Sequence, residues 1–154
     1  MKIRVLFTGK TDGRFVEEGV AHYARRMERY LPFVTEVVAA ARGGDPRKQK
    51  EKEGEAILRK AGREAYMVLL DERGEALTSE EFAAFLQKRM NAGTRELLFV
   101  VGGAYGVSPA VRERADKVLQ LSAMTFSHQV VRILLMEQLY RAMTILRGEP
   151  YHHR

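Results

Sequence analysis

The last residues of the chain gather three kinds of side chain that can do chemistry. Tyr151, His152, His153 and Arg154 follow Pro150 and offer a phenol, two imidazoles and a guanidinium. An imidazole, with an ordinary pKa of roughly 6.5, exchanges protons near neutrality, and a guanidinium binds phosphate or other anions. A disordered end or a tag remnant is the usual explanation of such a tail. Tyr151 and the hydrophobic segment before it favour a docked terminus instead.

Two further segments have compositions suited to ligand binding. Gly102 and Gly103 follow an apolar run, where glycines let a ligand approach the backbone or allow positive φ. A tight strand-to-helix turn is the simpler explanation of the glycines alone. The segment Leu121–Phe126 is apolar although it lies between a predicted strand and a predicted helix. It either packs into the core or lines an apolar pocket whose backbone binds a flat ligand with polar edges, such as a purine.

Several familiar sites are excluded by the residues themselves. The chain has no cysteine, which removes thiolate nucleophiles, disulfides and cysteine-ligated metals. Gly9, Lys10 and Thr11 imitate the end of a phosphate-binding loop, but Arg4 stands where that motif needs its first glycine. The glycines near position 102 do not fit a dinucleotide fingerprint, and no histidines have metal-ligand spacing apart from the adjacent pair in the tail. We therefore expect no bound metal.

Length and charge restrict the protein further. The 154 residues suit one domain, 1–154, and no segment is apolar enough for a signal peptide or a membrane span, so we expect a soluble cytoplasmic protein. The net charge of +6 favours an anionic partner such as nucleic acid. Between Arg42 and Arg63, eight positive and four negative side chains give +4. This segment is either a phosphate-facing surface or a plain solvated helix, and the composition supports both equally.

Strand and helix patterns alternate along the chain. We predict strands at 2–7, 33–38, 66–70, 97–101 and 118–121, a turn at 71–74, and helices at 14–30, 46–61, 78–92, 108–115 and 128–147. Thr78 and Glu81 form a capping-box pattern at the start of the third helix. The alternation predicts an α/β domain with a largely parallel central sheet flanked by helices. Ligands bind such sheets at the carboxyl ends of strands, which selects the loops after Phe7, Leu70, Val101 and Leu121.

The last predicted helix is apolar nearly all round, from Val130 to Leu146. Such a helix must be buried on more than one side, and a small single-sheet domain would leave one face exposed. We therefore expect a homodimer that covers this face. Burial within one chain is the alternative. Arg132, inside this helix, is a candidate for phosphate binding or equally for a structural ion pair.

Four motifs together resemble one known family. Residues 100–106 read Val-Val-Gly-Gly-Ala-Tyr-Gly, residues 121–132 read Leu-Ser-Ala-Met-Thr-Phe-Ser-His-Gln-Val-Val-Arg, residues 137–142 read Glu-Gln-Leu-Tyr-Arg-Ala, and residues 150–152 read Pro-Tyr-His. Their order and spacing resemble the RlmH family of SPOUT-class methyltransferases, which modify N3 of a pseudouridine in bacterial 23S rRNA. The resemblance covers the whole chain. Two positions depart from the family: Ser127 stands where proline commonly precedes the histidine, and His153 intervenes before Arg154.

The resemblance implies a SPOUT (α/β-knot) fold with a trefoil knot, a homodimer, and S-adenosylmethionine as methyl donor. It also implies a substrate in a stem-loop of 23S rRNA within the assembled ribosome. By position, the cofactor site falls on Leu70, Gly102, Gly103, Leu121, Ser122, Ala123, Met124, Thr125 and Phe126. The tail carries the chemistry in this interpretation. His152 would act as base or relay, Tyr151 would orient its ring, and Arg154 would bind phosphate or stabilise negative charge on the uracil carbonyls.

Two other functions fit the residues. A non-enzymatic RNA- or ribosome-binding factor would use the same basic surface and dimer and would need no cofactor. A small α/β enzyme that acts on a phosphorylated metabolite would turn over without RNA. Titration with S-adenosylmethionine separates the methyltransferase from the binding factor.

Overall fold

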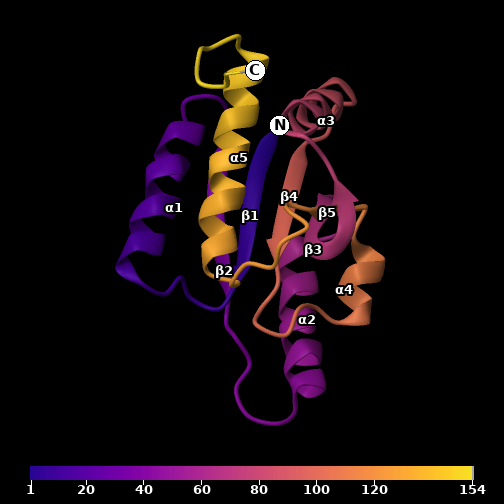
Figure 1. Cartoon of the computed structure of the whole chain (residues 1–154). Coiled ribbons are helices and arrows are strands. Elements are labelled where there is room, and N and C mark those ends of the chain that lie inside the picture. The colour runs from indigo at the N-terminus through magenta and orange to yellow at the C-terminus, as the bar shows by residue number, and fades with distance from the viewer. Residues whose placement is uncertain (154) are drawn as a thin grey trace.

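The fold is a five-stranded parallel sheet covered by helices on both faces (Figure 1). The structure, a computed structural model, describes residues 1–153. The strands stand in the order β2-β1-β4-β3-β5, and every neighbouring pair is parallel. The elements along the chain are β1 (Lys2–Thr8), α1 (Arg14–Met27), β2 (Phe33–Val38), α2 (Pro46–Ala61), β3 (Tyr66–Ala76), α3 (Ser79–Asn91), β4 (Glu96–Val101), α4 (Pro109–Arg114), β5 (Lys117–Gln120) and α5 (Val130–Leu146). The predicted α/β class with a largely parallel sheet is confirmed.

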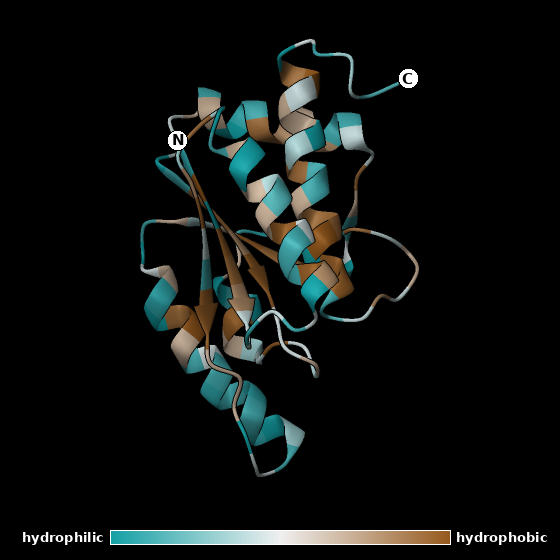
Figure 2. Cartoon of the chain, turned by 90° about the vertical axis from the view of Figure 1, so that its left-hand side faces the viewer, coloured by the Kyte–Doolittle hydropathy of each residue, from teal (hydrophilic) through white to brown (hydrophobic). Residues whose placement is uncertain are grey.

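Alternate residues of the central strands serve two separate cores, because successive side chains of a strand point to opposite faces. In β4, Phe99 packs with α1, α3 and α5, whereas Leu98 and Val100 pack with α2 and α4. All three side chains are fully buried. Figure 2 shows the hydrophobic strands between the two helix layers and the largely hydrophilic surface of α2. The continuous apolar runs of the sequence therefore correspond to strands that are buried on both faces.

The predicted turn at 71–74 is wrong, because β3 continues to Ala76. Leu70 and Glu75 both pair with Leu119, so four extra residues of β3 bulge out between two stretches of pairing with β5. Gly74 makes this possible, because a Cβ there would lie 2.7 Å from the backbone of Leu119. The charged residues 71–73 look like a turn in sequence, yet they form an irregular strand end that carries side chains towards one edge of the sheet.

The helix ends follow their local sequence signals closely. Thr78 caps α3 in a complete capping box with Glu81, as its spacing predicts. Asp45 caps α2 through a bond from the Lys48 backbone N–H, and Pro46 is its first residue. The first helix is shorter than predicted: α1 ends at Met27, and residues 28–30 form a turn.

α5 lies between α1 and α3 on one face of the sheet (Figure 1). Leu135, Met136 and Leu139 are fully buried there, so much of the apolar character of α5 is satisfied within one chain. Its first turns remain half-buried at Val130, Val131, Ile133 and Leu134. No helix in residues 1–153 is long and apolar enough to cross a membrane.

Candidate functional site

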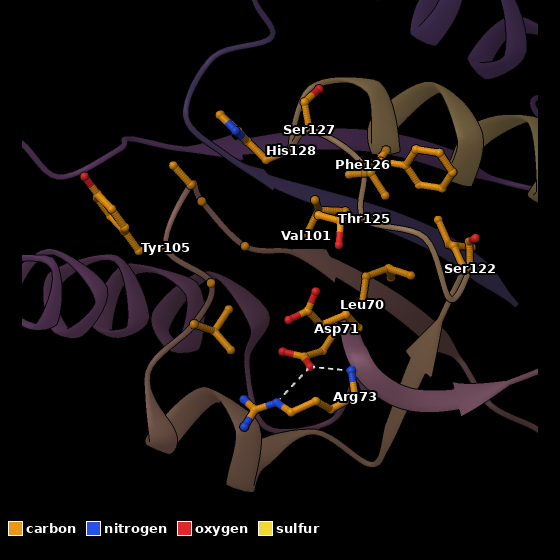
Figure 3. A pocket seen from close by; sticks show the side chains of 18 of the residues that line it. Leu70, Asp71, Arg73, Val101, Tyr105, Ser122, Thr125, Phe126, Ser127 and His128 are labelled. Carbon is orange, nitrogen blue, oxygen red and sulfur yellow. Dashed lines mark hydrogen bonds and ion pairs between the residues drawn. The ribbon is translucent and has the colours of Figure 1, made fainter.

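A cavity of about 680 Å³ opens at the carboxyl ends of β3, β4 and β5 (Figure 3). Its wall comes from the bulged part of β3 after Leu70, from the loops that follow Val101 and Gln120, and from the start of α5, with single residues of α2 and α4. The volume suits a cofactor-sized ligand, since such pockets commonly measure roughly 300–1,000 Å³. Ligands of parallel sheets bind at this end of the strands, and two of the four loops selected on that ground, those after Val101 and Leu121, line the cavity. The bulged part of β3 lies where the loop after Leu70 was expected. The loop after Phe7 does not contribute lining residues.

Most of the predicted cofactor positions meet at this cavity. Of the nine, eight line it: Leu70, Gly102, Gly103, Leu121, Ser122, Met124, Thr125 and Phe126. Ala123 lies exposed in the same loop but does not line the cavity. These residues come from three strands that are far apart in the sequence, so the sheet brings them together.

The glycines after β4 leave backbone where side chains would otherwise stand. A Cβ on Gly102 would lie 2.8 Å from Cγ1 of Val107 and 3.1 Å from the backbone of Gly106. On Gly103 it would lie 2.9 Å from a carboxylate oxygen of Glu53. The Gly106 N–H donates to the Gly103 carbonyl (3.0 Å) and closes a tight turn. Both predicted functions of the glycines are therefore compatible with the structure, because a tight turn and open backbone at the cavity coexist.

The loop from Leu121 to His128 forms an apolar rim around the same cavity. Met124 is 74% exposed and Phe126 is 40% exposed, although both are large apolar side chains. The Ser122 hydroxyl accepts the Met124 N–H (3.0 Å) and shapes the loop. Ser127, where the family commonly has proline, accepts the Val130 N–H (3.1 Å) at the start of α5. A serine hydroxyl thus satisfies a helix N–H at the position that a proline would have stiffened.

The floor of the cavity is polar and charged. Asp71 pairs with Arg112 and accepts hydrogen bonds from the Arg73 backbone N–H (2.8 Å) and from Arg73 Nε (3.4 Å). Burial raises the pKa of Asp71, but the hydrogen bonds and the two guanidinium groups outweigh it, so its pKa lies below the usual range. Asp71 is therefore a fixed carboxylate at neutral pH. Glu72 and Lys50 also line the cavity.

Sequence reasoning missed several lining residues. Asp71, Glu72 and Arg73 were assigned to a turn, whereas the strand bulge brings them to the cavity. Tyr105 belongs to the glycine motif and lies at the cavity wall opposite Phe126 (Figure 3). His128 lies at the cavity before α5. The signal for Tyr105 and His128 was their place inside motifs already noted. Lys50 of α2 belongs to the positively charged segment between Arg42 and Arg63, but nothing in that segment indicated that it reaches the cavity.

The tail lies away from this cavity in its own chain. Tyr151 contacts Tyr140 edge to face, with ring centroids 4.7 Å apart, and Arg141 lies over the Tyr151 ring. His152 Nδ1 lies 3.1 Å from Arg141 and its Nε2 3.0 Å from a Glu80 oxygen. Since a guanidinium only donates, Nδ1 accepts and Nε2 carries the proton that is donated to Glu80. The tail is docked on α5 and α3, and Arg154 lies outside the described residues.

The docked tail and the cavity lie far apart in the same chain. Arg141 follows Val131, a cavity residue, by ten positions in α5, which corresponds to about 15 Å along a helix axis. Burial raises the pKa of Tyr151 to about 12, with a hydrogen bond to Tyr23 as the next cause. The structure therefore gathers the predicted cofactor residues in one place and the tail residues in another.

Arg132 has neither of the two functions considered for it. Its side chain is fully buried and donates to the carbonyls of Thr8 (2.8 Å) and Gly9 (2.9 Å) and to the Thr11 hydroxyl (3.0 Å). Its guanidinium also lies over the Phe7 ring. Burial lowers its pKa to about 10, so the group stays charged at neutral pH. Arg132 ties the loop after β1 to α5 through backbone acceptors, and it is closed to a phosphate.

No cluster of three or more histidine, aspartate or glutamate side chains within residues 1–153 is arranged to hold a metal ion. What the cavity offers is open backbone, an apolar rim and fixed charges. This combination suits a flat ligand with polar edges and a charged end.

Comparison with known proteins agrees with this geometry. A family model described as "Predicted SPOUT methyltransferase" matches residues 1–152. A relative from Trichlorobacter lovleyi, named ribosomal RNA large subunit methyltransferase H, is 48% identical over 153 residues, covering 99% of this chain and all of the relative. A relative of the same name from Porphyromonas gingivalis is 49% identical over 156 residues, covering 99% of each chain.

Solved structures share the fold at low sequence identity. A tRNA (m1G37) methyltransferase from Aquifex aeolicus superposes with a TM-score of 0.58 at 13% identity, over all of this chain and 76% of that one. A methylase family protein from Neisseria gonorrhoeae gives a TM-score of 0.56 at 14% identity, over 99% of this chain and 86% of that one. From the whole-length family match and the two close relatives, the chain belongs to the SPOUT methyltransferases and, within them, to the RlmH family.

Proposed function

We propose that the protein is an S-adenosylmethionine-dependent methyltransferase that modifies N3 of a pseudouridine in 23S rRNA of the assembled ribosome. The observation that carries the proposal is the 680 Å³ cavity, at which eight of the nine expected cofactor positions converge from three strands. The names of the close relatives support ribosomal RNA as the substrate. The net charge of +6 suits an RNA partner.

The residues at the cavity fit this cofactor. Adenine needs an apolar slot with backbone groups at its edges, which Leu70, Leu121 and the open backbone at Gly102 provide. The methionine part carries a positively charged sulfonium, an ammonium group and a carboxylate. Charged side chains of both signs line the cavity, with Asp71 and Glu72 beside Arg73 and Arg112, so partners for each of these groups are present. When bound, the cofactor supplies an electrophilic methyl carbon.

The protein then has to orient the acceptor nitrogen and remove its proton. N3 of pseudouridine is an imide nitrogen and a weak nucleophile until it is deprotonated. His152 would remove this proton from N3, so that the nitrogen becomes a nucleophile. Tyr151 would orient the imidazole, and Arg154 would stabilise negative charge on the uracil carbonyls.

These roles require the tail to meet a cavity, and the docked tail of the same chain lies about 15 Å along α5 from its own cavity. We therefore propose that the site is completed in a homodimer, with the tail of one protomer serving the cavity of the other. A two-fold axis that pairs the α5 helices in antiparallel fashion places the end of one helix beside the start of the other. The half-buried apolar first turns of α5 suit such an interface.

The test has two parts. Calorimetric titration with S-adenosylmethionine is expected to show one saturable binding event, and transfer of a labelled methyl group is expected with assembled ribosomes and not with tRNA. Absence of cofactor binding together with retained ribosome binding would favour the non-enzymatic RNA-binding factor. Comparing assembled ribosomes with separate large subunits and with deproteinised 23S rRNA shows whether the assembled particle is required.

A further inference from the structure

Tyr105 is an aromatic side chain displayed at the cavity without cover from its own chain. It is 58% exposed, although it lines the cavity wall. In Figure 3 it lies across the cavity from Ser122 and Phe126, with Leu70 and Val101 between them. The apolar loop with Ser122 and Phe126 thus lies on one side of the cavity, and the Tyr105 ring lies on the other, on the turn that follows Gly102.

The turn that carries Tyr105 is held in place. Gly103 and Gly106 pair across it, and Gly106 adopts a φ of 85°, a conformation that favours glycine. The turn also packs on α2, because a Cβ on Gly103 would meet the buried carboxylate of Glu53 at 2.9 Å. Glu53 in turn accepts the Ala41 N–H (3.0 Å). A ring on so constrained a turn loses little freedom when it binds a partner.

The contact with α2 brings a positive charge to the same cavity that the Tyr105 ring lines. Lys50 precedes Glu53 by three residues, so the two share one face of α2, and Lys50 lines the same cavity as Tyr105. The same half of α2 carries Arg47, Lys48 and Lys52, all exposed. Of these, Arg47 is paired with Glu51 at 3.3 Å.

Single-stranded RNA is recognised by this pair of features, an aromatic face for a base and a cation for its phosphate. We propose that Tyr105 and Lys50 form a nucleotide subsite at the mouth of the cavity, in which an unpaired base of the RNA substrate stacks on the Tyr105 ring and its phosphate binds the Lys50 ammonium. The proposal rests on the proposed function for the identity of the substrate. It assigns to α2 the phosphate-facing role that composition alone left undecided.

Substitutions at both residues test the subsite against large ribosomal subunits, with the dissociation constant as the readout. Tyr105→Leu keeps apolar bulk and removes the aromatic face, so we expect binding at least about fivefold weaker, as for other base-stacking residues. The conservative Tyr105→Phe keeps the face and is expected to restore binding. Lys50→Gln is expected to lower the slope of affinity against salt concentration by about one. Lys88→Gln, with the same charge change on exposed α3, is the matched control.

Five outcomes of these experiments would contradict the nucleotide subsite or the proposed function. Equal binding by the Leu and Phe variants of Tyr105 would overturn stacking, and an unchanged salt slope for Lys50→Gln would overturn the phosphate contact. A parallel loss of S-adenosylmethionine affinity in Tyr105→Leu would assign the ring to the cofactor instead, and a change of oligomeric state in sedimentation would assign it to an interface between copies. A wild-type protein that binds subunits without binding S-adenosylmethionine would contradict the proposed function while leaving the subsite to be judged by its own readouts.

Discussion

At Gly102 the cavity depends on the absence of a side chain. The strand β4 ends there against Val107 and the backbone of Gly106, which leaves no space for a Cβ. The neighbouring charges are equally constrained, since Asp71 is held by Arg112 and by two groups of Arg73. Individual residues thus set both the shape and the charge of the proposed cofactor site, and substitutions at each have different consequences.

Gly102→Val is expected to abolish measurable binding of S-adenosylmethionine. The new side chain collides with Val107 and the Gly106 backbone, so the turn that lines the cavity must shift. Isothermal titration calorimetry measures the effect, and circular dichroism reports whether the fold is kept. Ala84→Val, which places the same side chain at an exposed position of α3, is the control. Wild-type affinity in Gly102→Val would place the cofactor elsewhere.

Asp71→Asn is expected to lower the free energy of unfolding at pH 7 by about 1–3 kcal/mol, because Arg112 loses its charged partner. The folded pKa of Asp71 is lowered, so its stabilisation is present above the unfolded value of about 3.9 and is lost as pH falls through the folded pKa. The gap between variant and wild type should therefore shrink as the pH falls from 5 to 3. Urea denaturation at several pH values measures it, with exposed Asp12→Asn as control. A gap independent of pH would contradict this account.

At the scale of elements, the sequence predicts most of the framework and little of its irregular parts. The capping box at Thr78 and the Pro46 start of α2 are local signals, and both are confirmed. The extension of β3 through residues 71–76 is not local, because it depends on pairing with β5, more than forty residues away. Lys50 reaches the cavity for a similar reason, since the fold brings α2 against the glycine turn. Long-range packing determines the positions of residues 71–76 and of Lys50, and the periodicity of the sequence does not predict such packing.

Arg132→Lys tests how α5 is joined to the loop after β1. A lysine has three donors on one nitrogen and cannot span the carbonyls of Thr8 and Gly9 and the Thr11 hydroxyl as the guanidinium does. We expect a loss of about 2–4 kcal/mol in the free energy of unfolding, measured by urea denaturation. Arg14→Lys, at a guanidinium that is almost fully exposed, should cost far less. Equal losses of stability in Arg132→Lys and Arg14→Lys would show that the buried hydrogen bonds of Arg132 do not stabilise the fold more than an exposed arginine does.

At the scale of the whole molecule, the proposed cofactor cavity and the proposed base occupy different places in one chain. His152 is docked on Arg141 and Glu80, and the cavity lies at the carboxyl ends of the strands. The motifs of the sequence pointed to the residues expected at the cofactor site and to those of the tail. They could not show that the two sets lie apart, because the position of the tail depends on its packing against Tyr140 and α3. The proposed homodimer would account for this separation, because each tail would then serve the other protomer's cavity.

Mixed dimers test this arrangement. The Gly102→Val homodimer should be inactive, because it lacks the cofactor site. The His152→Ala homodimer lacks the base, and its single-turnover methylation should be about 10²–10⁴-fold slower than that of the wild type. If the tail acts on the partner, a mixed dimer contains one intact site of two and should regain roughly half of the wild-type activity. If the tail acts within its own chain, mixed dimers stay inactive. Wild-type rates in the His152→Ala homodimer would show that His152 is not the base.

The most direct measurement of the central claim is the location of a transferred methyl group. Assembled ribosomes from a strain without the homologous enzyme are incubated with the protein and isotope-labelled S-adenosylmethionine, and the rRNA nucleosides are analysed by mass spectrometry. We predict one labelled methyl group per particle, on N3 of a pseudouridine of 23S rRNA, and none when Gly102→Val replaces the wild type. A label on another nucleoside, no label at all, or full labelling by Gly102→Val would contradict the account.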